Sequence, residues 1–144
     1  MKEASNQKKF KETLVGLSES DNYNQALKEW KFIYTTEKDN NCICGHPIVK
    51  NCVFENKINN AVVVIGSTCV KKFLNLDYSQ HFNIKLLLKK YSLKLLKYCL
   101  EEKIINKFEY DFLDNLPKFN KYSEKQRALF FKIHEKIFSE IEFV

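Results

Sequence analysis

Three cysteines, Cys42, Cys44 and Cys69, have the residue type and spacing for metal chemistry. Two thiols separated by one residue are poorly placed to pair with each other, because the ring would be too small for ordinary disulfide geometry. They can instead bind one metal ion together, and Gly45 lets the backbone fold its N–H groups around their sulfurs. The chain up to Gly66 is long enough for a hairpin that returns Cys69 to the same place. This spacing indicates a structural zinc site.

A tetrahedral structural zinc site needs a fourth ligand, and the sequence offers two candidates. Residues 42–45, which hold Cys42 and Cys44, form what we call the cysteine knuckle. His46 directly follows it, and imidazole is a routine partner for three thiolates. Cys52 is the alternative, but strand alternation places it with Ile48 and Phe54 on a core-facing side, where a thiol also serves as a small hydrophobic residue. We therefore favour His46 over Cys52. Cys99 lies on the apolar face of a helical segment and is predicted to be a core residue.

The composition favours a folded intracellular protein. The chain has 144 residues, 14% aromatic residues, 3 Gly and 2 Pro, which is unlike a disordered segment. An odd count of 5 Cys and the absence of an apolar leader after Met1 argue against secretion. The longest apolar runs are too short to span a bilayer, so no membrane association is expected.

The net charge of +6 is concentrated in one part of the chain. Residues 42–100 hold nine Lys against two acids, whereas residues 1–41 are neutral and residues 101–144 carry a net charge of −1. A patch of this sign attracts phosphate polyanions or an acidic protein, although a Lys-rich face can also serve solubility alone. Lys almost completely replaces Arg, so contacts with the phosphate backbone are expected rather than bidentate reading of bases. The candidate nucleic-acid contacts are Lys71, Lys72, Lys85, Lys89 and Lys90.

The first half of the chain is predicted to contain two helices and a small antiparallel sheet. Helical spacing of Phe10, Leu14 and Leu17 indicates a short first helix, and Asp21-Asn22 can cap a second over about 23–29. Alternating aromatic residues predict a strand from Trp30, followed by a loop over 37–41. Two further strands, 47–54 and 61–65, are joined by an Asn-rich hairpin loop over 55–60.

A short helix is expected to deliver the third thiol. Ser67 or Thr68 can cap a helix running from about Cys69 to Leu74, with the thiolate in its first turn. A knuckle, a hairpin and a helix that supplies a ligand together describe a treble-clef-like zinc module.

The second half of the chain is predicted to be helical. Residues 84–108 contain no Gly or Pro and suggest one long helix. Its main apolar face comprises Leu87, Leu88, Tyr91, Leu95, Tyr98 and Cys99, and a narrower stripe comprises Leu86, Leu96, Leu100 and Ile104. A further short helix ends at Leu116-Pro117, and Ser123 with Gln126 forms a capping box for the last helix. His81 is read as a loop residue and His134 as an ordinary helix histidine.

The sequence gives little support for catalysis. It contains no Gly-rich phosphate loop, no H-E-x-x-H motif, no nucleophile elbow and no pair of acids at a useful spacing. A catalytic zinc would also need a nearby general base, and Glu55 on the hairpin loop is the only acid near the cysteines in sequence. We therefore expect the protein not to be an enzyme.

Several residues give this chain a resemblance to small zinc-binding proteins of large DNA viruses and bacteriophages. The similar residues are Glu29-Trp30, Cys42-x-Cys44-Gly45-His46-x-Ile48, Asn56 and Gly66-Ser67-x-Cys69-Val70-x-Lys72-Phe73. The resemblance covers residues 29–73 and implies zinc binding through Cys42, Cys44, Cys69 and His46, together with a nucleic-acid or host-interaction role. A viral protein of this kind would act in the host cytoplasm, a viral factory or the nucleus.

Taken together, the sequence predicts an α+β fold in one domain, residues 1–144. A zinc-binding sheet module over 29–76 would pack against a helical part over 83–144. The predicted function is low-selectivity binding of DNA or RNA, with Tyr78 or Phe82 as exposed aromatics that could stack on bases. The alternative is a protein–protein adaptor or homodimer that uses the narrower apolar stripe.

Overall fold

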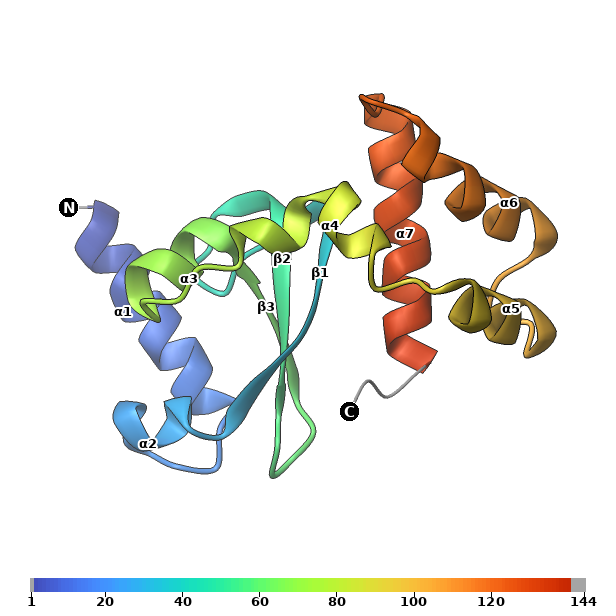
Figure 1. Cartoon of the computed structure of the whole chain (residues 1–144). Coiled ribbons are helices and arrows are strands. Elements are labelled where there is room, and N and C mark those ends of the chain that lie inside the picture. The colour runs from blue at the N-terminus through green and yellow to red at the C-terminus, as the bar shows by residue number, and fades with distance from the viewer. Residues whose placement is uncertain (1, 141–144) are drawn as a thin grey trace. The chain divides into compact units, whose positions relative to one another are not determined.

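The computed structural model describes residues 2–140, and the side chains of residues 6–140. The chain divides into two compact units, Met1–Tyr78 and Ser79–Val144. The predicted modules, 29–76 and 83–144, fall one in each unit. The first unit contains a three-stranded antiparallel sheet and the second is helical, which confirms the α+β prediction (Figure 1). Within the described residues, no helix is both long and apolar enough to cross a membrane.

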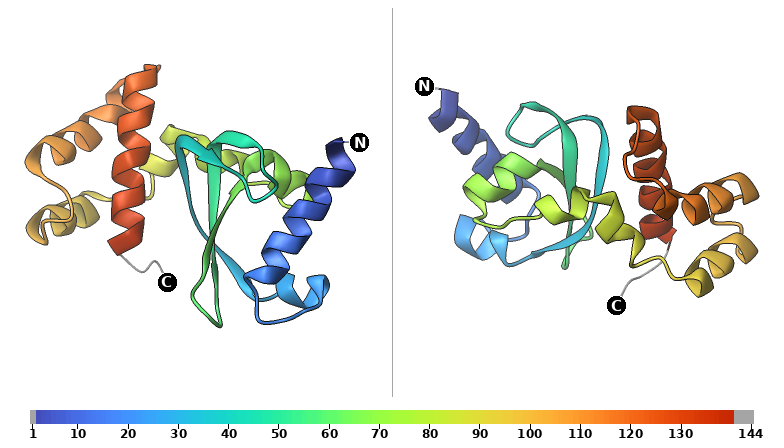
Figure 2. Two further views of the ribbon diagram at one scale, coloured as in Figure 1. Left: turned by 180° about the vertical axis from the view of Figure 1, so that it is seen from behind. Right: turned by 45° about the horizontal axis from the view of Figure 1, so that its top comes forward.

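The sheet of the first unit consists of β1 (Trp30–Asn41), β2 (Pro47–Asn56) and β3 (Val62–Gly66), in that spatial order (Figure 2). The loop predicted over 37–41 is wrong, because β1 continues as a strand to Asn41. This extension is possible because Asn40 and Asn41 pair with Ile48 and Pro47 after an irregularity in the register. The β1–β2 ladder therefore continues up to the cysteine knuckle, so the residues on both sides of the knuckle are fixed by strand pairing.

The loop between β2 and β3 is shaped by Asn56. Its side-chain oxygen accepts the backbone N–H groups of Ile58 and Asn59, and its backbone N–H donates to the carbonyl of Ala61. The amide nitrogen of Asn56 also donates to the carboxylate of Glu29, which is only 7% exposed. These bonds give the predicted hairpin its fixed geometry, since an Asn side chain can replace the missing backbone partners of a turn.

Three helices cover this unit: α1 (Lys2–Gly16), α2 (Tyr23–Leu27) and α3 (Ser67–Phe73). Phe10 and Leu14 of α1 are buried, as their spacing predicts, and the ring of Phe10 lies 5.0 Å from that of Phe73. Leu17 follows α1 and is 41% exposed, so it is not part of this core face. The cap of α2 is Asn22, whose side chain accepts the N–H of Gln25, which confirms the predicted start of that helix.

The second unit contains η1 (Ser79–Phe82), α4 (Ile84–Leu88), α5 (Leu93–Glu101), α6 (Lys107–Asn115), η2 (Leu116–Lys118) and α7 (Glu124–Glu140). The prediction of one long helix over 84–108 is wrong. The chain turns after Leu88, and the side chain of Ser92 accepts the N–H of Leu95 to start a new helix. Asn106 then forms a capping box with Glu109 and starts α6. Each restart depends on a polar side chain that can replace a helical hydrogen bond.

This interruption changes which residues reach the core. Leu87, Tyr91 and Cys99 are buried as predicted, but Tyr98 is 50% exposed. Leu96, assigned to the narrower stripe, is only 5% exposed, so that stripe does not form one continuous surface. A single helical wheel fails here because α4 and α5 are separate helices with separate orientations.

The core of the second unit is built around α7. Phe130, Phe131, Ile133 and Ile137 are completely buried, and η1 contributes Phe82. Ser123 and Gln126 form the predicted capping box through reciprocal backbone–side-chain hydrogen bonds. This cap fixes where α7 begins. The predicted apolar side of this helix comprises Leu129, Phe130, Ile133, Ile137, Phe138 and Ile141. Of these, Phe130, Ile133 and Ile137 are buried, Leu129 and Phe138 are half-buried, and Ile141 lies outside the described residues, while Phe131 is buried in addition.

Candidate metal centre

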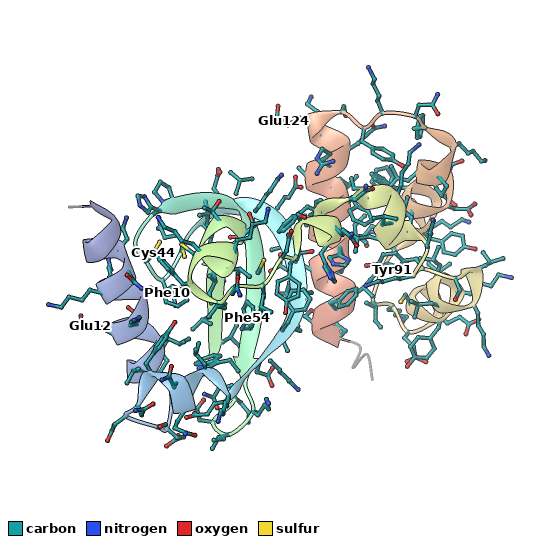
Figure 3. The ribbon with its side chains drawn as sticks, turned by 60° about the vertical axis from the view of Figure 1, so that its left-hand side comes forward. Phe10, Glu12, Cys44, Phe54, Tyr91 and Glu124 are labelled. Carbon is teal, nitrogen blue, oxygen red and sulfur yellow. The ribbon has the colours of Figure 1, made fainter. Side chains whose placement is uncertain are left out.

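Three thiols from two distant parts of the chain meet in the first unit. The Sγ atoms of Cys42, Cys44 and Cys69 all lie within 4.8 Å of one another, and those of Cys44 and Cys69 are 3.3 Å apart. Cys42 and Cys44 are buried and Cys69 is half-buried. Figure 3 shows sulfur atoms, drawn in yellow, close together beside the labelled Cys44. The structure therefore brings together the three ligands that the sequence predicts.

The first two thiols lie in the tight turn between β1 and β2. The N–H of Cys42 donates to the carbonyl of His46 over 2.9 Å, and the N–H of Gly45 donates to the carbonyl of Cys42 over 2.8 Å. Gly45 has a φ of +98°, which side-chain-bearing residues rarely adopt. Glycine is thus required here by the turn that points both sulfurs to the same side.

Cys69 reaches the cluster from the start of α3. The β2–β3 hairpin brings Gly66 opposite Asn51, and α3 begins at the next residue. The predicted cap by Ser67 or Thr68 is wrong, because the N-cap is Gly66. A Cβ on Gly66 would lie 2.8 Å from Cγ2 of Ile48, so only glycine fits this close approach of β3 to β2. Cys69 remains in the first turn of the helix, as the sequence indicates.

The surroundings of the cluster favour deprotonation at one thiol. The pKa of Cys42 is lowered well below its usual range, first by a hydrogen bond from the thiol of Cys69 and then by backbone N–H groups of Cys44 and Gly66. The pKa of Cys69 is raised, because its proton is held by Cys42 and because burial disfavours its charge. A metal ion takes thiolate ligands and releases their protons, and N–H groups directed at a sulfur stabilise that charged form.

The donor set fits a soft divalent metal ion. Sulfur ligands about 2.3 Å from zinc in a tetrahedron lie about 3.8 Å from one another. The Sγ atoms of Cys44 and Cys69 are 3.3 Å apart and all three Sγ atoms lie within 4.8 Å of one another, a spacing that can surround one ion. A cluster of three thiols suits zinc better than magnesium or calcium. Small side-chain rotations would place all three at bonding distance from a common centre.

His46, the favoured fourth ligand, is not part of the three-thiol cluster in this structure. Its side chain is exposed, and Nε2 contacts the amide nitrogen of Asn6 on α1. The imidazole lines the same cavity as Cys44 and Cys69, so it lies on the side of the cluster that a fourth ligand would approach. His46 as a ligand therefore stays a prediction.

Cys52, the other candidate, is a completely buried residue in the middle of β2. It lies opposite Thr35 on β1 and Ile65 on β3, and the three-thiol cluster does not include it. Burial, and secondarily the nearby charge of Cys42, raise the pKa of Cys52 to about 12. A thiol that holds its proton this firmly acts as a core residue, the role we also predicted for the buried Cys99.

The five candidate nucleic-acid lysines are all exposed, but they belong to different units. Lys71 and Lys72 lie on α3, and Lys71 pairs with Asp77 over 3.8 Å. Lys85, Lys89 and Lys90 lie on α4 or directly after it, in the second unit. The structure thus supports their accessibility, and their role in binding stays a prediction.

The prediction that Phe82 is an exposed aromatic residue is wrong, and Tyr78 is only half-exposed. Phe82 is only 5% exposed, and Tyr78 stacks on Phe32 with ring centroids 4.1 Å apart. The sequence reasoning missed Tyr98, which is half exposed on α5 with the exposed residues Lys94 and Lys97 near it in sequence. The two lysines close to it in sequence, Lys94 and Lys97, were the available signal for it.

Comparisons of the chain with protein-family models, curated proteins and solved structures found no match. The resemblance to viral and phage zinc proteins therefore stays a prediction.

Proposed function

We propose that this protein is a non-enzymatic, zinc-stabilised module that binds nucleic acid with low sequence selectivity. The observation that carries the proposal is the convergence of Cys42, Cys44 and Cys69 in a part of the chain whose lysines greatly outnumber its acids. Sulfur clusters of this type typically hold zinc for structure, and excess positive charge provides affinity for phosphates.

The metal would have a structural role. It would be held by the three thiols and by His46, which closes the coordination shell and leaves no open position for a substrate. In this role zinc would join the β1–β2 knuckle to α3 in a treble-clef-like arrangement. The ion would provide rigidity to a sheet of only three strands.

The mode of nucleic-acid binding follows from the side chains on the surface. Lys side chains act as flexible point charges, so they follow a phosphate backbone without reading base edges. Lys85, Lys89 and Lys90 are exposed within six residues of one another. On α5, the half-exposed ring of Tyr98 adds a surface on which a base could stack.

This proposal predicts a strong dependence of binding on salt. Labelled DNA and RNA oligonucleotides should bind with a Kd that rises steeply between 50 and 200 mM salt, because binding releases counterions from the phosphates. Replacing Lys85, Lys89 and Lys90 together with Gln should weaken binding about equally on all sequences. Fluorescence anisotropy over a salt series measures both effects.

A second triple variant separates local contacts from net charge. Lys118, Lys121 and Lys125 are exposed in the same unit, and replacing them with Gln removes the same charge. We expect a smaller loss of affinity from this control. Equal losses in the two variants would mean that only total charge matters, and absence of binding at micromolar protein would reject the proposed function.

Exposed apolar side chains in the second unit favour a second candidate, a protein–protein adaptor. Leu93 is 53% exposed and Phe108 is 67% exposed, which is unusual for side chains of this size. A second copy of the chain is the simplest partner. Size-exclusion chromatography with light scattering should then show a dimer that Phe108→Ser converts to a monomer; a monomer at all concentrations would contradict this alternative.

A further inference from the structure

The positive charge of the second unit is concentrated in residues 84–101, which we call the α4–α5 segment. It holds five lysines and a single acid, Glu101, at its last position. All five lysines are exposed: Lys85, Lys89, Lys90, Lys94 and Lys97. Within the part of the chain that the structure describes, none of the five forms an ion pair. No acid therefore offsets their charge at close range, and it is available to a polyanion.

The exposed face of α5 combines part of this charge with a large aromatic ring. Lys94, Lys97 and Tyr98 are all exposed on this helix. Lys94 and Tyr98 are four residues apart, so they are neighbours on the helix surface with Cβ atoms about 5–6 Å apart. Lys97 is three residues from Lys94 and shares its face. Two cationic side chains thus lie within one helical turn of the ring.

The ring of Tyr98 is available to an external partner. The side chain is 50% exposed. Among the described residues, its ring contacts no other aromatic ring and no cation, and its hydroxyl makes no hydrogen bond. Tyr78 and Tyr91 differ from it, because the first stacks on Phe32 and the second bonds His134 in the core. An exposed ring of this kind is a surface on which a base can stack.

The arrangement of this face suits a strand of phosphates better than a lipid surface. A helix that lies in a membrane interface buries one continuous apolar face. The two large apolar side chains of the α5 face, Leu93 and Tyr98, are five residues apart, which is about 140° around the helix. Lys94 and Lys97 lie between them, so the face has no continuous apolar stripe.

We propose that the α4–α5 segment binds single-stranded nucleic acid, with the phosphates at its lysines and one base stacked on Tyr98. The inference rests on the proposed nucleic-acid-binding function and gives that function a location and a strand class. A base can stack on an external ring only when one of its own faces is free. In a duplex both faces are covered, and extruding a base costs free energy. Single strands avoid this cost.

The test uses the full-length protein and three labelled ligands that differ in their bases. The ligands are a 12-nucleotide single strand, a duplex of the same sequence, and a strand of the same length built from abasic nucleotides. Tyr98→Ala removes the ring and Tyr98→Phe keeps it. Phe108→Ala is the matched control, because Phe108 is 67% exposed in the same unit but lies on α6 with three acids, Glu109, Asp111 and Asp114. Fluorescence anisotropy gives Kd, and thermal melting shows whether each variant is folded.

Tyr98→Ala should weaken binding of the single strand about tenfold, which corresponds to the loss of one base stack. Its affinity for the duplex and for the abasic strand should change about twofold or less, because neither ligand offers a free base. Tyr98→Phe and Phe108→Ala should both bind the single strand as wild type does. Wild-type protein should bind the single strand more tightly than the duplex, and Tyr98→Ala should remove this difference.

A pair of double variants tests the phosphate contacts of the same face. Lys94→Gln/Lys97→Gln should lower the slope of log Kd against log salt by about 1.4 on the single strand, because each single-strand phosphate contact contributes about 0.7. Lys121→Gln/Lys125→Gln removes the same charge from exposed lysines elsewhere in the unit. This control should lower the slope by half as much or less.

Other outcomes overturn the inference and identify what failed. An unchanged single-strand affinity in Tyr98→Ala, or an equal loss on all three ligands by the folded variant, would reject base stacking on α5 and leave the proposed function in place. Binding to vesicles that contain phosphatidylserine, lost in Tyr98→Ala while single-strand affinity is unchanged, would assign this face to a lipid surface. Absence of binding by wild-type protein to any strand would reject the proposed function itself.

Discussion

Removing the metal should destabilise the first unit by several kcal/mol. Protein purified under reducing conditions is expected to carry one zinc ion per chain, and a chelator, or the replacement Cys42→Ser, should remove it. The ion would connect the β1–β2 turn to α3, and structural zinc contributes about 10–16 kcal/mol of binding free energy in small zinc-finger peptides. The loss should be smaller here, because Phe10, Leu14 and Ile65 give this unit an apolar core of its own.

The chain provides a convenient reporter for this experiment. Trp30 is its only tryptophan and begins β1, so tryptophan fluorescence follows unfolding of the first unit. Elemental analysis gives the zinc content of the same samples. Less than stoichiometric zinc in freshly purified protein, or a fluorescence transition that chelation does not move, would contradict a structural metal centre.

Matched variants distinguish metal ligands from other buried thiols. Cys99→Ala removes a completely buried thiol in the second unit and should leave the zinc content unchanged. His46→Ala and Cys52→Ala then compare the two candidates for the fourth ligand. We expect His46→Ala to weaken zinc binding while Cys52→Ala retains it; the opposite result would assign the fourth position to Cys52.

The three-thiol cluster was predictable because most of its determinants are local. Cys42, Cys44 and Gly45 form one turn, and the Asn-rich loop closing at Asn56 and Ala61 is a hairpin that returns the chain beside itself. Antiparallel pairing then fixes where Cys69 must lie. The starts of α2 and α7 were predictable for the same reason, since each N-cap is a hydrogen bond between residues three apart.

Features that depend on distant residues could not be read from the sequence. The imidazole of His46 is held by Asn6, forty residues away along the chain. Lys50 and Lys72 meet at one cavity only because β2 and α3 lie side by side in the fold. The segment between α4 and α5 contains no Gly or Pro that would mark a break. Ser92 caps a new helix there because the chain turns to place the side chain of Tyr91 in the core. Tertiary packing decided this boundary over helix propensity.

A buried pair in the second unit was likewise hidden in the sequence. His134, which reads as an ordinary helix residue, is only 2% exposed, and its Nδ1 bonds the hydroxyl of Tyr91. Its ring stacks on Phe130 with centroids 5.7 Å apart and also contacts Phe138. Figure 3 shows the side chain of Tyr91 in this unit. The hydroxyl of Tyr91 and Nδ1 of His134 are thus hydrogen-bonding partners inside the core, so neither of these buried polar atoms is left unsatisfied.

This pair should make the second unit sensitive to acid. Burial, followed by the charges of Lys90 and His81, lowers the pKa of His134 to about 3. In the unfolded chain a histidine takes up its proton near pH 6.5. The unfolded state therefore binds one more proton than the folded state between these two values, so stability is complete above about pH 6.5 and falls as the pH decreases toward 3. The expected loss is about 1.4 kcal/mol per pH unit within that window.

Native-state hydrogen exchange on α7 measures this effect separately from the stability of the first unit, because protection in α7 reports opening of the second unit. Wild-type protein should lose protection steadily from pH 6.5 to pH 4.5 after correction for the intrinsic exchange rate. His134→Gln keeps a hydrogen-bonding side chain beside Tyr91 but cannot take up a proton. The free energy of opening in this variant should therefore vary with pH less steeply than in wild type, by the contribution of about one proton. His81→Gln, at a half-buried position, is the control and should retain most of the wild-type slope. If His134→Gln showed the same slope as wild type, protonation of His134 would not limit the stability of this unit in acid.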